Sequence, residues 1–222
     1  MKKPIHSRRK FISSIAATTS LTGLAGAGFA GIPMPGGKST SEADEWFNKV
    51  KGTHRIVYDA PEPHMGFPVI WSWAFMMTNN QTGTSDDDMT SVVVLRHNAI
   101  PFAIHDAMWE KYKFGDMFNI TDNNTGNAAV RNTVYDPKGS DFPLPIVEGI
   151  KRQQERGAMF CVCDLALAVY SGAAAAQMGL DPEETKQEWV DNVMPGIQIV
   201  PSGVWALGRA HEHDCGYIYA GG

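Results

Sequence analysis

Residues 90–95 read Thr90-Ser91-Val92-Val93-Val94-Leu95, a nearly continuous β-branched and apolar run. A strand that is apolar on both faces is typical of the centre of a parallel sheet, because crossover helices cover both sides of such a sheet. Four other short apolar runs have the length of strands. They cover residues 54–59, 158–163, 197–200 and 217–219.

Segments with the apolar spacing of helices separate these strands. They cover residues 67–78, 104–113, 146–156 and 165–178, a segment that starts at Asp181, and residues 204–213. This alternation predicts an α/β fold, a three-layer sandwich around a mostly parallel sheet of about five strands. Ligands of such sheets bind at the carboxyl ends of the strands.

The first 30 residues resemble an export signal. Residues 7–12 read Ser7-Arg8-Arg9-Lys10-Phe11-Ile12, and a mildly apolar run follows them up to Ala30. This order is typical of a twin-arginine signal peptide, and we expect cleavage after Ala27 or Ala30. The protein is then delivered to the periplasm by the twin-arginine export machinery. The alternative is an ordinary amphipathic first helix with two surface arginines.

The rest of the chain has the composition of one globular domain. Residues 31–52 begin with several Pro and Gly and are expected to be a leader or linker. The domain is expected to span residues 53–222, with an inserted loop at about 119–145 that is rich in Asn, Asp, Gly and Pro. No stretch reaches the ~18 unbroken apolar residues of a membrane-spanning helix, so no stable membrane span is expected after signal cleavage.

Charge excludes one class of partner. Residues 31–222 contain 14 basic and 24 acidic residues, a formal charge of −10. Nucleic-acid-binding surfaces need clustered Lys and Arg, so no nucleic-acid partner is expected.

An ordered series of segments near the C-terminus resembles the DsrE/DsrF-like family. The series is Phe160-Cys161-Val162-Cys163, then Gly179-Leu180-Asp181-Pro182-Glu183-Glu184, then residues 194–204, and finally Gly216-Tyr217-Ile218-Tyr219. The strand that ends at His97 is similar to the family's second strand. The resemblance implies a flavodoxin-like fold, a homotrimer or hexamer and, in the sulfur-handling members, a cysteine that carries persulfide between partners.

Cys163 and His97 are the candidate functional residues. Cys163 lies where a strand meets the N-terminus of a helix, and backbone amides there favour a thiolate. Asp164 carries a negative charge that disfavours the thiolate, but we expect its carboxylate to cap that helix, so that backbone amides partly offset the charge. His97 ends the neighbouring strand, and we expect it to line one pocket with Cys163. The alternatives are a buried core thiol and a histidine bonded to loop backbone.

The remaining cysteines and histidines predict no metal site, and the sequence does not identify a cofactor. Cys161 is expected to be a core residue. His211 and His213 are two apart on an expected helix, where their side chains point in different directions and do not form a metal site with Cys215. The chain has no phosphate-binding loop, no Gly-x-Ser-x-Gly and no haem-attachment motif.

Two functions follow from these residues. The first is an exported oligomeric carrier that handles sulfur or thiol redox chemistry through Cys163. The second is a non-catalytic periplasmic binding or scaffold protein that holds a small ligand or metal at the strand ends or at a subunit interface. Both are closer to a carrier or binding protein than to a true enzyme.

Replacing Arg8 and Arg9 together by Lys is expected to leave the full-length protein in the cytoplasm, because the export machinery recognises the arginine pair. Cell fractionation and immunoblotting measure the outcome, and Lys10→Gln is a control just outside the pair. Periplasmic delivery of the double variant at the wild-type level would contradict the signal assignment.

Overall fold

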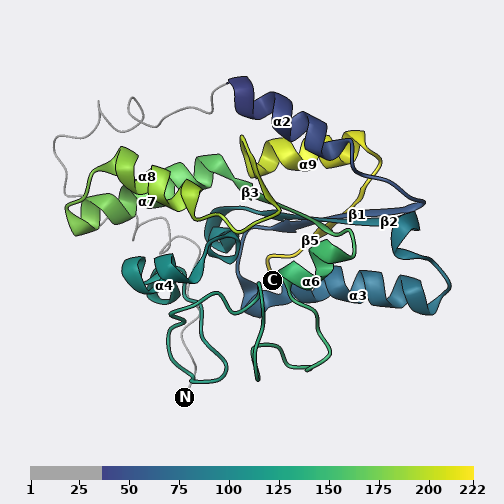
Figure 1. Ribbon diagram of the computed structural model, residues 1–222, viewed down its shortest axis with the longest axis horizontal. Helices are drawn as coiled ribbons and strands as arrows, with labels where there is room; N and C mark the ends of the chain where they lie inside the picture. The colour runs from purple at the N-terminus through teal and green to yellow at the C-terminus, as the bar shows by residue number, and fades with distance from the viewer. Residues whose placement is uncertain (1–36) are drawn as a thin grey trace, which may run out of the picture. The chain divides into compact units, whose positions relative to one another are not determined.

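Five parallel strands form one sheet in the computed structural model, which describes residues 37–222 (Figure 1). The signal peptide and its cleavage sites lie outside the described residues. The strands run in the order β4-β3-β2-β1-β5. Their bounds are β1 His54–Ala60, β2 Met89–Leu95, β3 Met159–Cys163, β4 Ile197–Val200 and β5 Gly216–Tyr219. The predicted α/β sandwich is confirmed, and each pairing between these strands is parallel.

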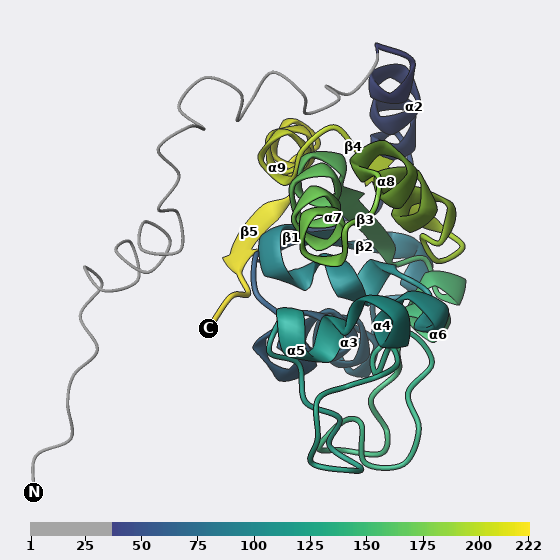
Figure 2. The same cartoon turned by 90° about the vertical axis from the view of Figure 1, so that its left-hand side faces the viewer.

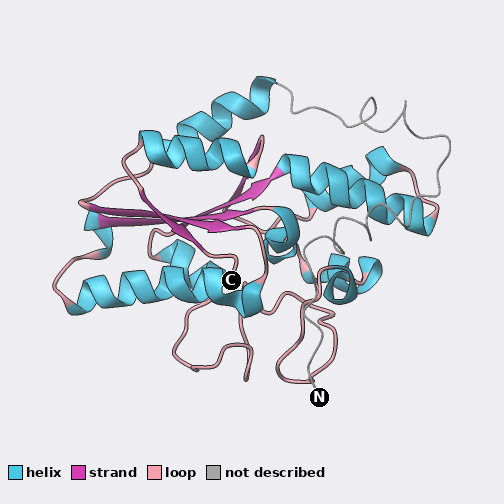
Figure 3. Ribbon diagram, turned by 180° about the vertical axis from the view of Figure 1, so that it is seen from behind, coloured by secondary structure: helices cyan, strands magenta, loops and turns pink. Residues whose placement is uncertain are grey.

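Helices cover the two faces of this sheet. On one face lie α3 (Phe67–Gln81) and α6 (Ile150–Glu155), and on the other lie α2 (Gly37–Phe47) and α9 (Gly203–Glu212), as Figures 1 and 3 show. Every residue of β2 is buried between them. Two apolar cores result, one on each side, and β2 contributes Val92 and Val94 to one and Val93 and Leu95 to the other.

The remaining helices gather beyond the carboxyl ends of the strands. They are the short helices α4 (Asp106–Tyr112) and α5 (Phe114–Met117), and the pair α7 (Asp164–Met178) and α8 (Pro182–Asp191) (Figure 2). Trp189 of α8 is fully buried and packs edge to face on Tyr112 and Phe114. This contact fixes the helix pair against α4 and α5. Within residues 37–222, no helix is both long and apolar enough to cross a membrane.

Helix α2 corrects the expectation of a leader over residues 31–52. The Pro and Gly residues before it suggested a linker, but the helix that follows carries Trp46 and Phe47, which are buried in the core under α9. Asp44 accepts a hydrogen bond from Arg209 of α9 at 2.6 Å. Burial of two aromatic side chains outweighs the weak local preference of the segment, so the domain begins within the expected linker.

The loop expected at 119–145 lies inside an irregular segment that runs from Phe118 to Gly149. Its own side chains hold it together. Arg131 pairs with Asp141 at 2.6 Å and with Asp122 at 3.1 Å. Asn132 donates from Nδ2 to the backbone oxygen of Phe102 at 2.9 Å, which anchors the loop to the end of the sheet.

An ion pair with a buried carboxylate joins β1, β5 and the residue after β2 at the carboxyl edge. Asp59 of β1 is 3% exposed and accepts hydrogen bonds from Nε and Nη2 of Arg96, at 2.6 and 3.0 Å. These bonds raise the pKa of the Arg96 guanidinium. The Tyr217 hydroxyl of the edge strand β5 donates to the same carboxylate at 2.8 Å. A Cβ atom at position 203 would lie 2.6 Å from Arg96, so Gly203 makes room for the arginine.

Asp59→Asn is expected to lower the free energy of unfolding by about 2 kcal/mol, because a half-buried arginine loses its anion. Tyr217→Phe removes a single hydrogen bond and is expected to cost about 1 kcal/mol. Urea unfolding followed by circular dichroism measures both. A wild-type unfolding midpoint for Asp59→Asn would show that the pair does not stabilise the sheet edge.

Candidate functional site

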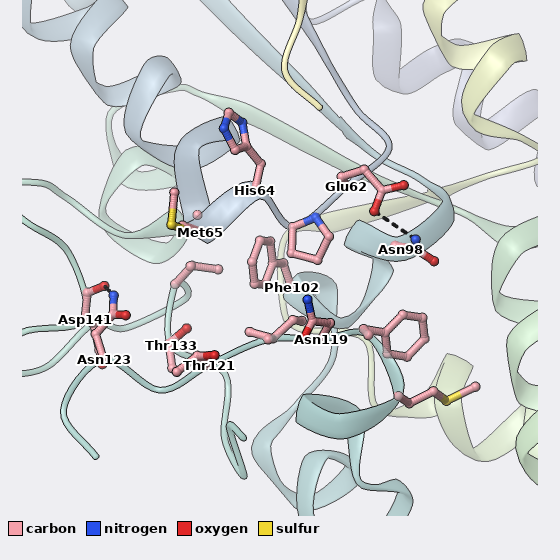
Figure 4. Close-up of a pocket in the computed structure, with 16 residues that line it drawn as sticks. Glu62, His64, Met65, Asn98, Phe102, Asn119, Thr121, Asn123, Thr133 and Asp141 are labelled. Carbon is pink, nitrogen blue, oxygen red and sulfur yellow. Dashed lines mark hydrogen bonds between the residues drawn. The ribbon is translucent and has the colours of Figure 1, made fainter. Parts of the chain in front are cut away.

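A pocket of about 710 Å³ lies beside the carboxyl ends of β1 and β2 (Figure 4). One wall comes from the link between β1 and α3, including the short 3-10 helix η1 (His64–Gly66). A second comes from the 3-10 helix η3 (His97–Ala103), which follows β2. The helix α5 and the irregular loop complete the pocket. The pocket therefore lies at the edge where ligands of parallel α/β sheets bind.

The backbone beside the pocket has an uncommon shape. His64, Met65 and His97 have positive φ angles of 40°, 51° and 51°. Such angles are rare for residues other than glycine, and they often mark functional sites. The ring of His64 packs against Phe67, and its Nδ1 atom is buried without a hydrogen-bond partner in the described structure.

Three polar contacts and one aromatic contact join four side chains between the pocket wall and α7 into what we call the polar ring. Tyr170 of α7 donates from its hydroxyl to Oδ1 of Asn98 at 2.6 Å. Asn98 donates from Nδ2 to Oε2 of Glu62 at 2.8 Å. Nδ1 of His97 lies 3.4 Å from Oε1 of Glu62, and its ring meets Tyr170 edge-on at 5.8 Å. Burial and then the Glu62 charge raise the pKa of Tyr170.

The loop side of the pocket is polar and carries little free charge. Asn119, Thr121, Asn123 and Thr133 contribute amides and hydroxyls to it (Figure 4). Asp141 also lies there, but Arg131 donates to both of its oxygens, at 2.6 and 2.8 Å. No lysine or arginine is among the residues that line this pocket.

Cys163 lies outside the lining of this pocket and is 6% exposed. Its Sγ atom accepts a hydrogen bond from the amide of Ala166 at 3.3 Å, so Cys163 itself caps α7. The expectation that Asp164 caps this helix is therefore wrong. Asp164 pairs instead with Lys186 of α8, at 3.0 Å.

The structure gives Cys163 and His97 separate partners. Cys163 stands opposite Val200 in the register between β3 and β4. His97 follows β2 and contacts Glu62 and Tyr170. We expected these two residues to line one pocket, but His97 lies beside the pocket while Cys163 contributes to the apolar core.

The other two cysteines are buried in the protein. Cys161 is fully buried, and burial raises the pKa of its thiol. Cys215 is buried too, and this raises its pKa to about 11. All three cysteines are free. Within the described residues, no three His, Cys, Asp or Glu side chains stand together in a way that could hold a metal ion.

Sequence reasoning missed Glu62, Asn98 and Tyr170. None belongs to a motif, and the two hydrogen bonds that join them span 36 and 72 residues of sequence. One signal was available. Glu62 and Asn98 both follow strands of the expected sheet within three residues, at the edge where ligands bind.

Comparisons with known proteins leave the function open. No family model matches the chain, and no curated protein matches it. A solved structure with some similarity is a protein of unknown function, MTH1491 from Methanobacterium thermoautotrophicum, at 13% sequence identity and a TM-score of 0.38. The similarity covers 75% of this chain and 98% of that chain.

In the folded protein, Cys163 is expected to react with iodoacetamide as slowly as Cys161, because both side chains are buried and must wait for local opening. Labelling at timed intervals, followed by peptide mass spectrometry, measures each site separately. All three cysteines should react rapidly after unfolding in guanidinium. Rapid labelling of Cys163 alone in the folded protein would contradict its inaccessibility.

Proposed function

We propose that this protein is a binding protein that holds a small polar molecule in the pocket beside β1 and β2. The observation that carries the proposal is the pocket itself, of about 710 Å³ at the carboxyl edge of the sheet. Small-molecule sites in proteins have volumes of ~300–1,000 Å³ and combine apolar walls with a few polar groups. Phe102, Phe118 and Ile120 supply the apolar walls.

The chemistry of the lining selects among ligands. The pocket offers one carboxylate without a lysine or arginine partner in the described structure, Glu62, together with several amides and hydroxyls. A bound anion would meet this negative charge with no lysine or arginine among the described lining residues to offset it. A neutral or cationic molecule with hydrogen-bonding groups fits the lining better.

Export and assembly are part of the proposal. The twin-arginine pattern at Arg8 and Arg9 supports a periplasmic protein. The homotrimer or hexamer is supported by the family resemblance and by exposed apolar side chains on α7, among them Leu165 and Val169. Light scattering that gives a monomer at micromolar concentration would contradict the assembly.

A sulfur carrier that uses Cys163 is the second candidate function. It is favoured by the amide of Ala166, which points at the sulfur and stabilises an anion there, and by Lys186, which offsets the charge of Asp164. The burial of Cys163 counts against it, since a carrier thiol must meet a partner.

A large side chain placed inside the pocket is expected to abolish binding. Thr121 lies on the loop and is exposed, so Thr121→Trp fills the pocket without disturbing the core. Ala128→Trp is the matched control, because Ala128 pairs with Thr121 in the same bridge, is exposed and lies outside the pocket lining.

Equilibrium dialysis against a mixture of cellular metabolites, read by mass spectrometry, measures the result. Wild type and Ala128→Trp are expected to retain at least one common compound that Thr121→Trp does not retain. Retention of the same compounds by all three proteins, or of none by the wild type, would contradict a binding function for this pocket.

A further inference from the structure

We infer, on the basis of the proposed function, that the ligand carries a primary amine and that Glu62 binds it. Glu62 follows β1 by two residues and reaches the pocket from the edge of the sheet. Its side chain is 41% exposed, so solvent or a ligand has access to the carboxylate.

The carboxylate of Glu62 retains capacity to accept hydrogen bonds. Asn98 donates to Oε2 at 2.8 Å, and Nδ1 of His97 lies 3.4 Å from Oε1. A carboxylate has two oxygens with about four acceptor positions, so two contacts leave room for a ligand. An ammonium group has three donors and no acceptor, which complements a group that only accepts.

The neighbours of Glu62 hold the carboxylate in place before a ligand arrives. Asn98 is itself fixed by the Tyr170 hydroxyl at 2.6 Å and by its backbone amide, which donates to the oxygen of Pro61 at 2.9 Å. The carboxylate therefore loses little freedom on binding, and preorganisation of this kind increases affinity. Asn98, His97 and Tyr170 act on the ligand through Glu62, so they are positioning residues.

The charges near the pocket favour a cation over an anion. Arg131 belongs to the irregular loop but lies outside the pocket lining, and its guanidinium pairs with Asp141 and Asp122. Glu62 has no lysine or arginine partner within residues 37–222. Phe102 and Phe118 also line the pocket, and aromatic rings attract cations.

Three probes with the same four-carbon chain test the inference. They are putrescine, the corresponding diol and succinate, measured by calorimetry at low salt. The wild type is expected to bind putrescine at least about tenfold more tightly than the diol, because a hydrogen bond to a charged group is stronger than a neutral one. Succinate is expected not to bind.

Variants identify the group responsible. Glu62→Gln keeps the shape of the side chain and is expected to remove the preference for putrescine over the diol. Glu183→Gln removes the same charge from an exposed position on α8 and is expected to keep the preference. Tyr170→Phe releases Asn98 and is expected to weaken putrescine binding several-fold while the diol is unaffected.

The outcomes separate this inference from the proposed function. Tighter binding of the diol or of succinate, or an unchanged preference in Glu62→Gln, overturns the amine inference. If the probe that binds the wild type does not bind Thr121→Trp but still binds Ala128→Trp, the pocket still has a binding function. Failure of all three probes to bind the wild type also overturns the inference, and the dialysis comparison of the two tryptophan variants then decides the proposed function alone.

Discussion

The complete burial of β2 is the constraint on which the rest of this fold depends. A strand with no exposed residue needs a neighbour on each side and helices above and below, and β1, β3, α3 and α9 meet these needs. Because helices cover both faces of the sheet, polar groups can be accessible in the loops that follow the strands at the carboxyl edge. The polar ring around Glu62 and the pocket both lie at this edge.

Two polar arrangements at this edge differ in how their charges are balanced. Asp59 and Arg96 neutralise each other in a buried pair that ties β5 to the sheet through Tyr217, so little of their charge reaches solvent. In the part of the chain that the structure describes, Glu62, three residues after Asp59, has a histidine and an amide side chain as its partners. A paired carboxylate such as Asp59 stabilises the fold, whereas Glu62, which has no lysine or arginine partner in the described structure, is the carboxylate that we propose binds a ligand.

Much of this fold could be predicted from sequence, because strands such as β2 and β3 are nearly continuous apolar runs and helices such as α8 begin at ordinary caps. The prediction failed where tertiary contacts override local preference. Helix α2 depends on Trp46 and Phe47 reaching a core that α9 completes. Cys163 caps α7 although Asp164 is the more usual cap, because Lys186 of α8 draws Asp164 away. The polar ring joins residues whose hydrogen bonds span up to 72 positions, and no local pattern specifies them.

A crystal structure of the protein isolated from its natural compartment, without refolding, tests the central claim most directly. We expect electron density for a small molecule in the pocket, with a nitrogen within hydrogen-bond distance of the Glu62 carboxylate and an unmodified sulfur at Cys163. A pocket filled by its own side chains, together with additional sulfur bonded to Cys163, would contradict a binding role for the pocket and favour the carrier.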